Sequence, residues 1–239
     1  MRISQIQFGT ALASVLAAPC AALAAPQTYD YLITHSRYGT IGSYDRTIDE
    51  AGGVTHAKSH LRIAVKILGL VVHRENADQS ETWRGQRLVA FHSVTTSNGK
   101  PMTVSGEARD NGFVVTSPTG VATAPADVAA TDPWGFNRMG RAEVVSLKSG
   151  KIEPINVTGG EADQVTLHGV RAPARHFHVS TAAQPNKWEV WLDPQGVPIK
   201  FRSLEHGDTV DFTLTTRLPA GHGPKALALV RSGQGPDVQ

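Results

Sequence analysis

The sequence has a single cysteine among its 239 residues, Cys20, close to the N-terminus. One cysteine forms no internal disulfide, so the fold has to be stabilised by a buried apolar core. About 215 residues follow the first 24, enough for such a core in one β domain or in two small ones. The chain is therefore not a small domain stapled by disulfides.

Residues 1–24 have the features of an export leader. A positive charge at Arg2 precedes an apolar stretch from Phe8 to Leu16, and small residues follow at Ala22-Leu23-Ala24. Signal peptidases accept such an Ala-x-Ala sequence, and the apolar stretch is too short to span a membrane. We predict a Sec-type signal peptide cleaved near Ala24. The mature chain, without cysteine, suits a bacterial periplasm.

No excess of one charge is present. The chain has 23 Lys and Arg against 21 Asp and Glu, and removal of the leader with Arg2 leaves 22 against 21. Binding to nucleic acid or to an anionic membrane surface depends on clustered positive charge. We therefore expect no nucleic-acid partner.

Long apolar runs and catalytic motifs are lacking too. After Ala25 no apolar run approaches the roughly 20 residues of a spanning helix, so we expect no integral membrane segment once the leader is removed. There is no Gly-x-Ser-x-Gly motif, and the sequence has no internal repeat of fixed period. Gly39 and Gly42 follow a strand pattern without opening a helix, which indicates a turn, and we expect no cofactor.

What the sequence does contain is an alternation of apolar and polar residues with a period of two. In Ser59–Ile67 the apolar residues Leu61, Ile63 and Val65 alternate with polar ones, which is typical of a strand with one covered face. Similar segments recur between residues 28 and 216. The pattern predicts an all-β protein of roughly ten strands.

The segments are separated by residues that tolerate a positive φ, so neighbouring strands should pair as antiparallel hairpins. The predicted turns are Asp49–Gly53, Arg84–Gly85, Ser97–Lys100, Asp110–Gly112, Lys148–Lys151, Asp193–Gly196 and Glu205–Asp208.

One stretch, residues 117–140, breaks this rhythm with three prolines and the alanine-rich piece Ala126–Ala130. We expect it to cross the sheet as a loop with one short helical turn. The domain is then residues 25–218, and the Pro- and Gly-rich residues 219–239 are predicted to form a disordered tail.

His176 and His178 lie on one face of a predicted strand, opposite Phe177. Two imidazoles at this spacing can share a metal ion, but a zinc site needs a third or fourth ligand. Local spacing identifies none, so His168 or an acidic group would have to arrive through the fold. The alternative is a pair of solvated histidines, and on balance we predict no metal site.

Glu81 precedes Trp83 by two residues, which places carboxylate and indole on the same face of a strand. A carboxylate against an aromatic wall can have a raised pKa and act as an acid or base. The alternative is an exposed glutamate beside a tryptophan at the rim. Glu81, His176 and His178 are the candidate catalytic residues.

Aromatic side chains on a curved sheet can line an apolar pocket, although they can equally fill an ordinary core. The candidates for ligand binding are Trp83, Trp134, Phe136, Trp191, Phe91 and Phe177.

Several segments, among them Tyr38–Tyr44, Glu81–Leu88, Thr95–Lys100 and Trp191–Phe201, resemble an uncharacterised group of exported bacterial β proteins. That group is similar in pattern to the lipoprotein-localisation superfamily of LolA- and LolB-type half-barrels. The resemblance implies one strongly curved antiparallel sheet, a half-barrel or open barrel, around an apolar cavity that holds a hydrophobic or lipid-like ligand.

Three functions follow from this reading. The first is a periplasmic binding or carrier protein for a hydrophobic small molecule or lipid. The second is an enzyme that uses the same cavity, with Glu81 or a histidine as acid or base. The third is a non-catalytic scaffold or assembly protein whose sheet edge recruits an envelope protein partner.

Overall fold

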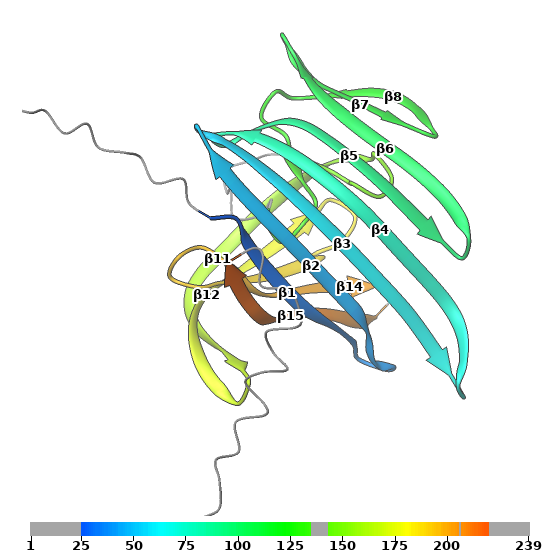
Figure 1. Ribbon diagram of the computed structural model, residues 1–239, viewed down its shortest axis with the longest axis vertical. Coiled ribbons are helices and arrows are strands. Elements are labelled where there is room, and N and C mark those ends of the chain that lie inside the picture. Colours follow the sequence, from blue (N-terminus) through cyan, green and yellow to red (C-terminus); the bar gives the residue numbers. More distant parts are fainter. Residues whose placement is uncertain (1–24, 135–142, 206, 220–239) are drawn as a thin grey trace, which may run out of the picture.

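The computed structural model describes residues 25–134, 143–205 and 207–219, and in these residues the protein is all-β (Figure 1). The predicted leader and nearly all of the predicted tail lie outside the described residues. The strands are β1 (Gln27–His35), β2 (Gly39–Ala51), β3 (Val54–Ile67), β4 (Leu70–Arg84), β5 (Arg87–Ser97), β6 (Lys100–Arg109), β7 (Gly112–Ser117), β8 (Gly120–Ala124), β9 (Ala129–Ala130), β10 (Glu143–Val145), β11 (Ile152–Leu167), β12 (Val170–Thr181), β13 (Trp188–Leu192), β14 (Pro198–Glu205) and β15 (Asp208–Pro219).

All fifteen strands belong to one sheet, in the order β8 to β1 followed by β15 to β9. Each half is a meander of hairpins, and the two halves are joined where β1 pairs with β15 from Gln27 opposite Pro219 to His35 opposite Val210. The described neighbours are antiparallel except β9 and β10, which are parallel. The sheet is open, with β8 and β9 at its edges, and it does not close into a barrel.

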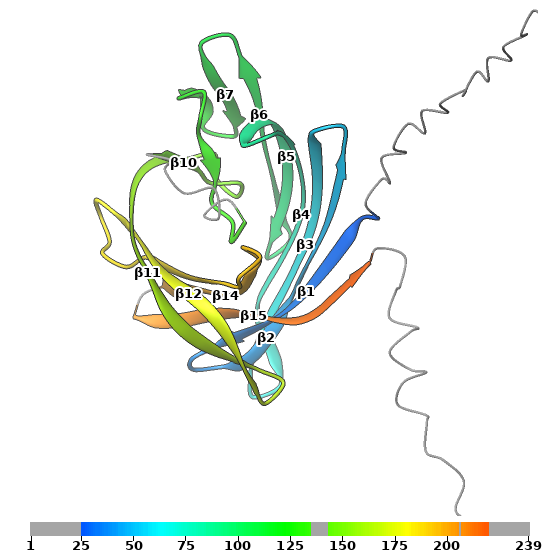
Figure 2. The ribbon, with the colours of Figure 1, turned by 90° about the vertical axis from the view of Figure 1, so that its left-hand side faces the viewer.

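The sheet curls strongly, as seen along its side in Figure 2. Strands β3–β5 face β11 and β12 across the interior of the curl. The long, twisted hairpins and the register shifts in β1, β2, β3, β4, β11 and β13 suit this curvature, because a bulge bends a strand and increases its twist. The predicted curved antiparallel sheet is confirmed in this coarse form.

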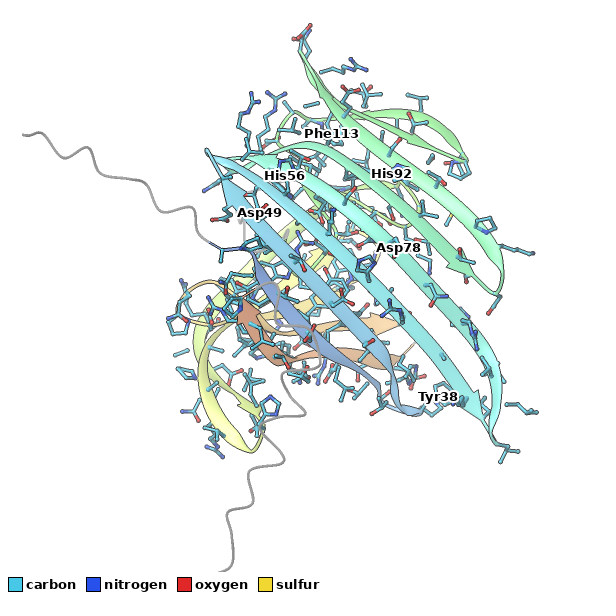
Figure 3. All side chains as sticks on the ribbon, viewed as in Figure 1. Tyr38, Asp49, His56, Asp78, His92 and Phe113 are labelled. Atoms are coloured by element: carbon cyan, nitrogen blue, oxygen red, sulfur yellow. The ribbon has the colours of Figure 1, made fainter. Side chains whose placement is uncertain are left out.

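The predicted alternation is confirmed as well. Phe177, Val179 and Val210 are buried inside the curl, while His56 and His92 are exposed on its convex face (Figure 3). No helix of the described residues is long and apolar enough to cross a membrane.

The strand number exceeds the prediction in part because two tight turns use unusual residues. Leu68–Gly69 and His168–Gly169 each have two successive residues with positive φ, like the recognisable Asn98–Gly99. Such a type I′ turn favours Asn-Gly, and leucine or histidine in its first position gives no turn signal. The hairpins β3–β4 and β11–β12 therefore extend further than the sequence suggests.

The predicted helical crossing is wrong for the described residues. The alanine-rich piece begins as a turn, in which the Val128 N–H donates to the Pro125 carbonyl at 3.1 Å. Ala129 and Ala130 then form β9 beside Val144 and Val145 of β10. Both alanines are fully buried. Buried backbone groups need hydrogen-bond partners, and pairing with β10 provides them.

The described part of the crossing, up to residue 134, lies inside the curl and contributes to its core. Its small side chains pack with aromatic and aliphatic residues from both halves of the sheet. This main core comprises Trp83, Leu88, Phe91, Val104, Phe113, Val115, Ala124, Val128, Ala129, Ala130, Val144, Val145, Leu147, Phe177, Val179, Val190, Leu192 and Phe201.

The turn at Leu68 gives a test of the local backbone argument. Leu68 is 98% exposed with φ of 51°. Its replacement by asparagine therefore loses no packing, and asparagine adopts a positive φ more readily than leucine does. We expect Leu68→Asn to raise the free energy of unfolding by about 0.5–1 kcal/mol. Urea denaturation measures this change, and a lower free energy of unfolding would contradict the assigned turn.

Candidate functional site

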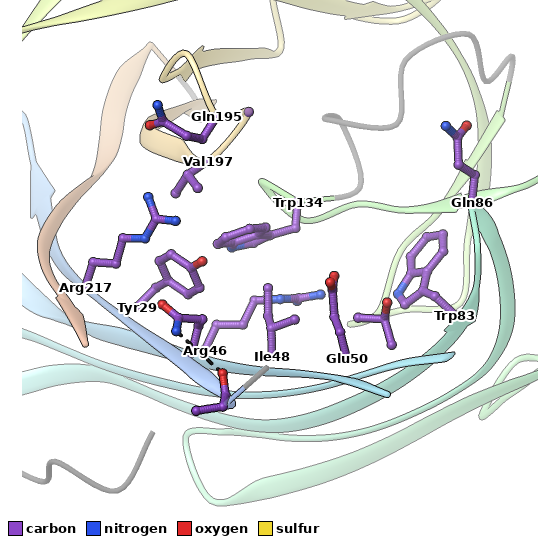
Figure 4. Close-up of a pocket in the computed structure, with 14 residues that line it drawn as sticks. Tyr29, Arg46, Ile48, Glu50, Trp83, Gln86, Trp134, Gln195, Val197 and Arg217 are labelled. Atoms are coloured by element: carbon purple, nitrogen blue, oxygen red, sulfur yellow. Dashed lines mark hydrogen bonds between the residues drawn. The ribbon is translucent and has the colours of Figure 1, made fainter. Parts of the chain in front are cut away.

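The described residues line two cavities inside the curl, with a layer of buried polar side chains between them. The first, the tryptophan cavity, has a volume of about 490 Å³ and is lined among others by Tyr29, Arg46, Trp83, Trp134 and Arg217 (Figure 4). The second, the aliphatic cavity, has a volume of about 530 Å³ and lies toward the other end of β2–β4. Both volumes are within the range of ligand pockets, roughly 300–1,000 Å³.

The layer between the cavities is organised by Arg46 of β2. Its Nη1 lies 2.8 Å from Glu81 Oε1 and 2.9 Å from Asp132 Oδ2, and all three side chains are almost completely buried. We call Arg46, Glu81 and Asp132 the arginine clamp. Because Asp132 belongs to the crossing and the other two to the sheet, the clamp fastens the crossing inside the curl.

Neighbouring polar groups complete this layer. Arg46 Nη1 also donates to Ser59 Oγ at 3.2 Å, and the Tyr44 hydroxyl donates to the same oxygen at 3.0 Å. Burial raises the pKa of Tyr44 to about 12, against the opposing effect of Arg46. The Tyr31 hydroxyl donates to the Pro198 carbonyl at 2.8 Å, which connects the layer to the first residue of β14.

Glu81 therefore has a structural environment, and its pKa is lowered rather than raised as the aromatic neighbour alone would allow. Burial alone would raise its pKa, but attraction to Arg46 and hydrogen bonds to the carboxylate lower it on balance. The predicted contact with Trp83 is present, since the indole N–H donates to Glu81 Oε2 at 2.9 Å. Both residues are buried, so the rim alternative is wrong as well.

The tryptophan cavity combines aromatic and charged groups. Tyr29 and Trp134 meet edge to face with 4.6 Å between ring centroids, and the Arg217 guanidinium lies 5.5 Å from the centroid of Tyr29. The Arg46 guanidinium lies 5.7 Å from Trp134. Glu50 adds a negative charge to the wall. Such a surface suits a polar or charged molecule better than an acyl chain.

The aliphatic cavity has apolar residues on more than one side, among polar ones. Leu61, Ile63 and Val65 of β3 line it on one side, and Phe201 and Phe212 of β14 and β15 line it on another. The two phenylalanines contact each other edge to face at 5.6 Å. The three β3 residues and Phe212 are only partly buried, unlike the tightly enclosed main core.

Polar groups lie on the wall of the same cavity. Lys148 Nζ lies 2.6 Å from Glu75 Oε2, and His73 Nε2 lies 3.7 Å from the same oxygen. The Lys148 side chain is 53% exposed, whereas that of Glu75 is 9% exposed. The cavity thus offers an apolar surface together with a polar end that reaches solvent.

The structure separates the aromatic candidates into different environments. Trp134 lines the tryptophan cavity, Trp83 lines it as well as packing in the main core, and Phe91 and Phe177 belong to the main core alone. Trp191 is buried on the opposite, convex face, in a small cluster with Val165, Ala174 and Ile199. Phe136 lies outside the described residues. The predicted ligand surface is therefore not one site.

The other candidates, His176 and His178, lie on the convex face as the alternation predicts, away from both cavities. Residues that the sequence reasoning missed are Arg46, Asp132, Glu75 and Lys148. A signal exists for Arg46, because it occupies an inward position between Tyr44 and Ile48 on β2. For Asp132 and Lys148, which lie outside regular alternation, no comparable signal exists.

Residues 36–215 match the family described as Domain of unknown function (DUF6134). In structure the chain is similar to a β-barrel-like protein of domain of unknown function DUF1849 from Brucella abortus, with a TM-score of 0.57 and 9% sequence identity over 82% of this chain and 98% of that chain. At this identity the likeness concerns the fold alone. No curated protein matches the sequence.

The clamp predicts a large effect on stability when its cation is removed. Arg46→Met leaves Glu81 and Asp132 buried without their shared counter-charge, and we expect a loss of about 3–5 kcal/mol in the free energy of unfolding. The control is Arg109→Met, because Arg109 forms an exposed pair with Glu107 worth under about 1 kcal/mol. Urea denaturation compares the variants, and equal losses would contradict the clamp.

The lowered pKa of Glu81 predicts a dependence on pH. The folded protein keeps this carboxylate ionised to lower pH than the unfolded chain, so its stabilising effect is present above the ordinary pKa of 4.5 and disappears as pH falls through the folded value. The stability difference between wild type and Glu81→Gln should shrink on acidification from about pH 7 to about pH 3. A difference that grows on acidification would show that the pKa is raised.

Proposed function

The chain belongs to the family described as Domain of unknown function (DUF6134), and we propose that it is a periplasmic binding or carrier protein for a hydrophobic or lipid-like molecule. The proposed ligand site is the aliphatic cavity. The observation that carries this proposal is the row of partly exposed Leu61, Ile63 and Val65 facing Phe201 and Phe212 across about 530 Å³.

The contrast with the rest of the interior supports this choice. Phe91 and Phe177, which have the same inward parity, are enclosed by the crossing and leave no room for a ligand. The β3 row remains partly exposed, and covering it with an apolar molecule would remove that surface from water. Each buried methylene contributes about 0.8 kcal/mol, against an association cost of about 4–15 kcal/mol. A preformed wall reduces that cost.

The polar groups favour an amphiphile over a plain hydrocarbon. Lys148, Glu75 and His73 supply donors and an acceptor beside the apolar wall. An apolar tail can therefore lie along β3 while a polar head reaches these side chains. The resemblance to LolA- and LolB-type half-barrels, which bind acyl chains, agrees with this ligand class.

The enzyme alternative loses its strongest candidate. Glu81 is held in the arginine clamp with a lowered pKa, and a general acid at neutral pH needs a raised one. His176 and His178 are on the convex face, remote from the cavity. Binding therefore accounts for the geometry of the interior better than catalysis by these residues.

A charge placed among the apolar residues of the aliphatic cavity should weaken ligand binding. We expect Ile63→Asp to weaken the binding of a fluorescent fatty acid at least tenfold, equivalent to about 1.4 kcal/mol, because the carboxylate must be desolvated beneath the tail. Fluorescence titration of the purified protein, after solvent extraction of any bound lipid, measures the affinity.

The matched control is Ile48→Asp on the neighbouring strand, which places the same charge in the tryptophan cavity. It should leave the affinity unchanged, and circular dichroism verifies that both variants fold. If Ile48→Asp weakens binding and Ile63→Asp does not, the ligand occupies the tryptophan cavity instead. A wild-type protein that binds no fatty acid and carries no amphiphile in native mass spectrometry would refute the proposal.

A further inference from the structure

Three metal-ligating side chains gather on the convex face of β12 and β13. His178 lies directly opposite Glu189 in the pairing of the two strands, and His176 lies two residues before His178. One nitrogen from each histidine and one carboxylate oxygen all lie within 4.8 Å of one another. We call His176, His178 and Glu189 the histidine site. Glu189 is the acidic third group that local spacing cannot reveal.

The orientation of His176 is fixed by its surroundings. Its ring stacks on the Trp191 indole, with 4.1 Å between centroids and 12° between planes. The Trp191 N–H donates to Asp163 Oδ2 at 2.8 Å, and His176 Nδ1 lies 3.7 Å from the same oxygen. Nδ1 thus faces a carboxylate, and Nε2 points to Glu189 Oε2 at 3.1 Å. At 3.7 Å this is a charge contact rather than a hydrogen bond, and a small shift would give the carboxylate–histidine hydrogen bond that is typical of metal ligands.

His178 completes the arrangement. Its ring centroid lies 4.3 Å from that of His176, and its Nδ1 is buried without a hydrogen-bond partner among the described residues. A buried polar nitrogen without a partner is costly. The nearby cations form ion pairs with another carboxylate: Arg202 donates to both oxygens of Asp211 at 2.6 and 2.8 Å, and Lys200 lies 3.0 Å from the same group. Arg202 is also the residue opposite Glu189 on β14 and attracts its charge.

We propose that the histidine site binds a divalent transition-metal ion of the zinc type. Two imidazoles and one carboxylate are a ligand set that zinc uses when one coordination position stays open to water. At Zn–N distances of about 2.0–2.1 Å, tetrahedral ligands lie roughly 3.3 Å apart, close to the 3.1 Å between His176 and Glu189. The third ligand atom, on His178, lies within 4.8 Å of the other two. The site is independent of the aliphatic cavity, which opens on the other face.

Zinc titration of the untagged full-length mature protein, in competition with a chromogenic chelator, tests this proposal. We expect one ion per chain and an affinity that falls at least tenfold in His178→Ala and in Glu189→Gln. Asp163→Asn should weaken binding about tenfold, since outer-shell partners have effects of this size. The control is His92→Ala, an exposed histidine on the convex face of β5 (Figure 3), which should bind zinc as wild type does.

A second measurement keeps the test independent of folding defects in the variants. Zinc should raise the thermal unfolding temperature of the wild type and of His92→Ala, because an ion that binds only the folded state stabilises it. It should not raise that of a folded His178→Ala. No zinc uptake by the wild type, or equal affinity in all four variants, would overturn the proposal and leave His176 and Glu189 as a structural hydrogen-bonded pair.

Discussion

The arrangement of the interior depends on the arginine clamp. The sheet of fifteen strands curls on itself, and the described residues of the crossing after β8 pack inside that curl. Apolar packing of Ala129 and Ala130 keeps the crossing inside, but packing alone has little directionality. The charge-assisted hydrogen bonds from Arg46 to Glu81 and Asp132 define its position.

Because the clamp consists of buried charges, it also divides the interior. The clamp residues need their hydrogen bonds to compensate for the burial of their charges, and apolar side chains in place of the surrounding polar groups would remove those bonds. The polar layer therefore separates a cavity of aromatic and charged groups from one with an aliphatic wall. A single hollow half-barrel does not describe this protein: one part of the curl is a filled core, and the cavities lie on either side of the clamp.

The sequence allows the fold class to be predicted because local alternation and turn chemistry act over a few residues. The parity of Leu61, Ile63 and Val65 assigns them to the concave face, and the structure confirms it. The turn at Leu68 escaped prediction because leucine has no intrinsic preference for a positive φ. There the pairing of β3 with β4 imposes the conformation on an unfavourable residue.

The sites could be predicted only in part, since parity gives the face of a residue but not what covers that face. Phe177 and Phe201 both point inward, yet Phe201 lines the aliphatic cavity and Phe177 does not. Trp191 points outward and is nevertheless buried, because it packs with Val165 and Ala174 of the β11–β12 hairpin. The residues that cover a given face come from distant parts of the sequence, and the alternation within one strand does not predict which ones they are.

Strand β13 shows how one short element serves both faces of the sheet. Trp188 lines the aliphatic cavity, whereas the next residue, Glu189, belongs to the histidine site. The period of two places these neighbours on opposite faces, so they are adjacent in the chain without sharing a surface. The pairing of β13 with β12 and β14 holds both residues in place, so a single strand positions side chains for two separate sites.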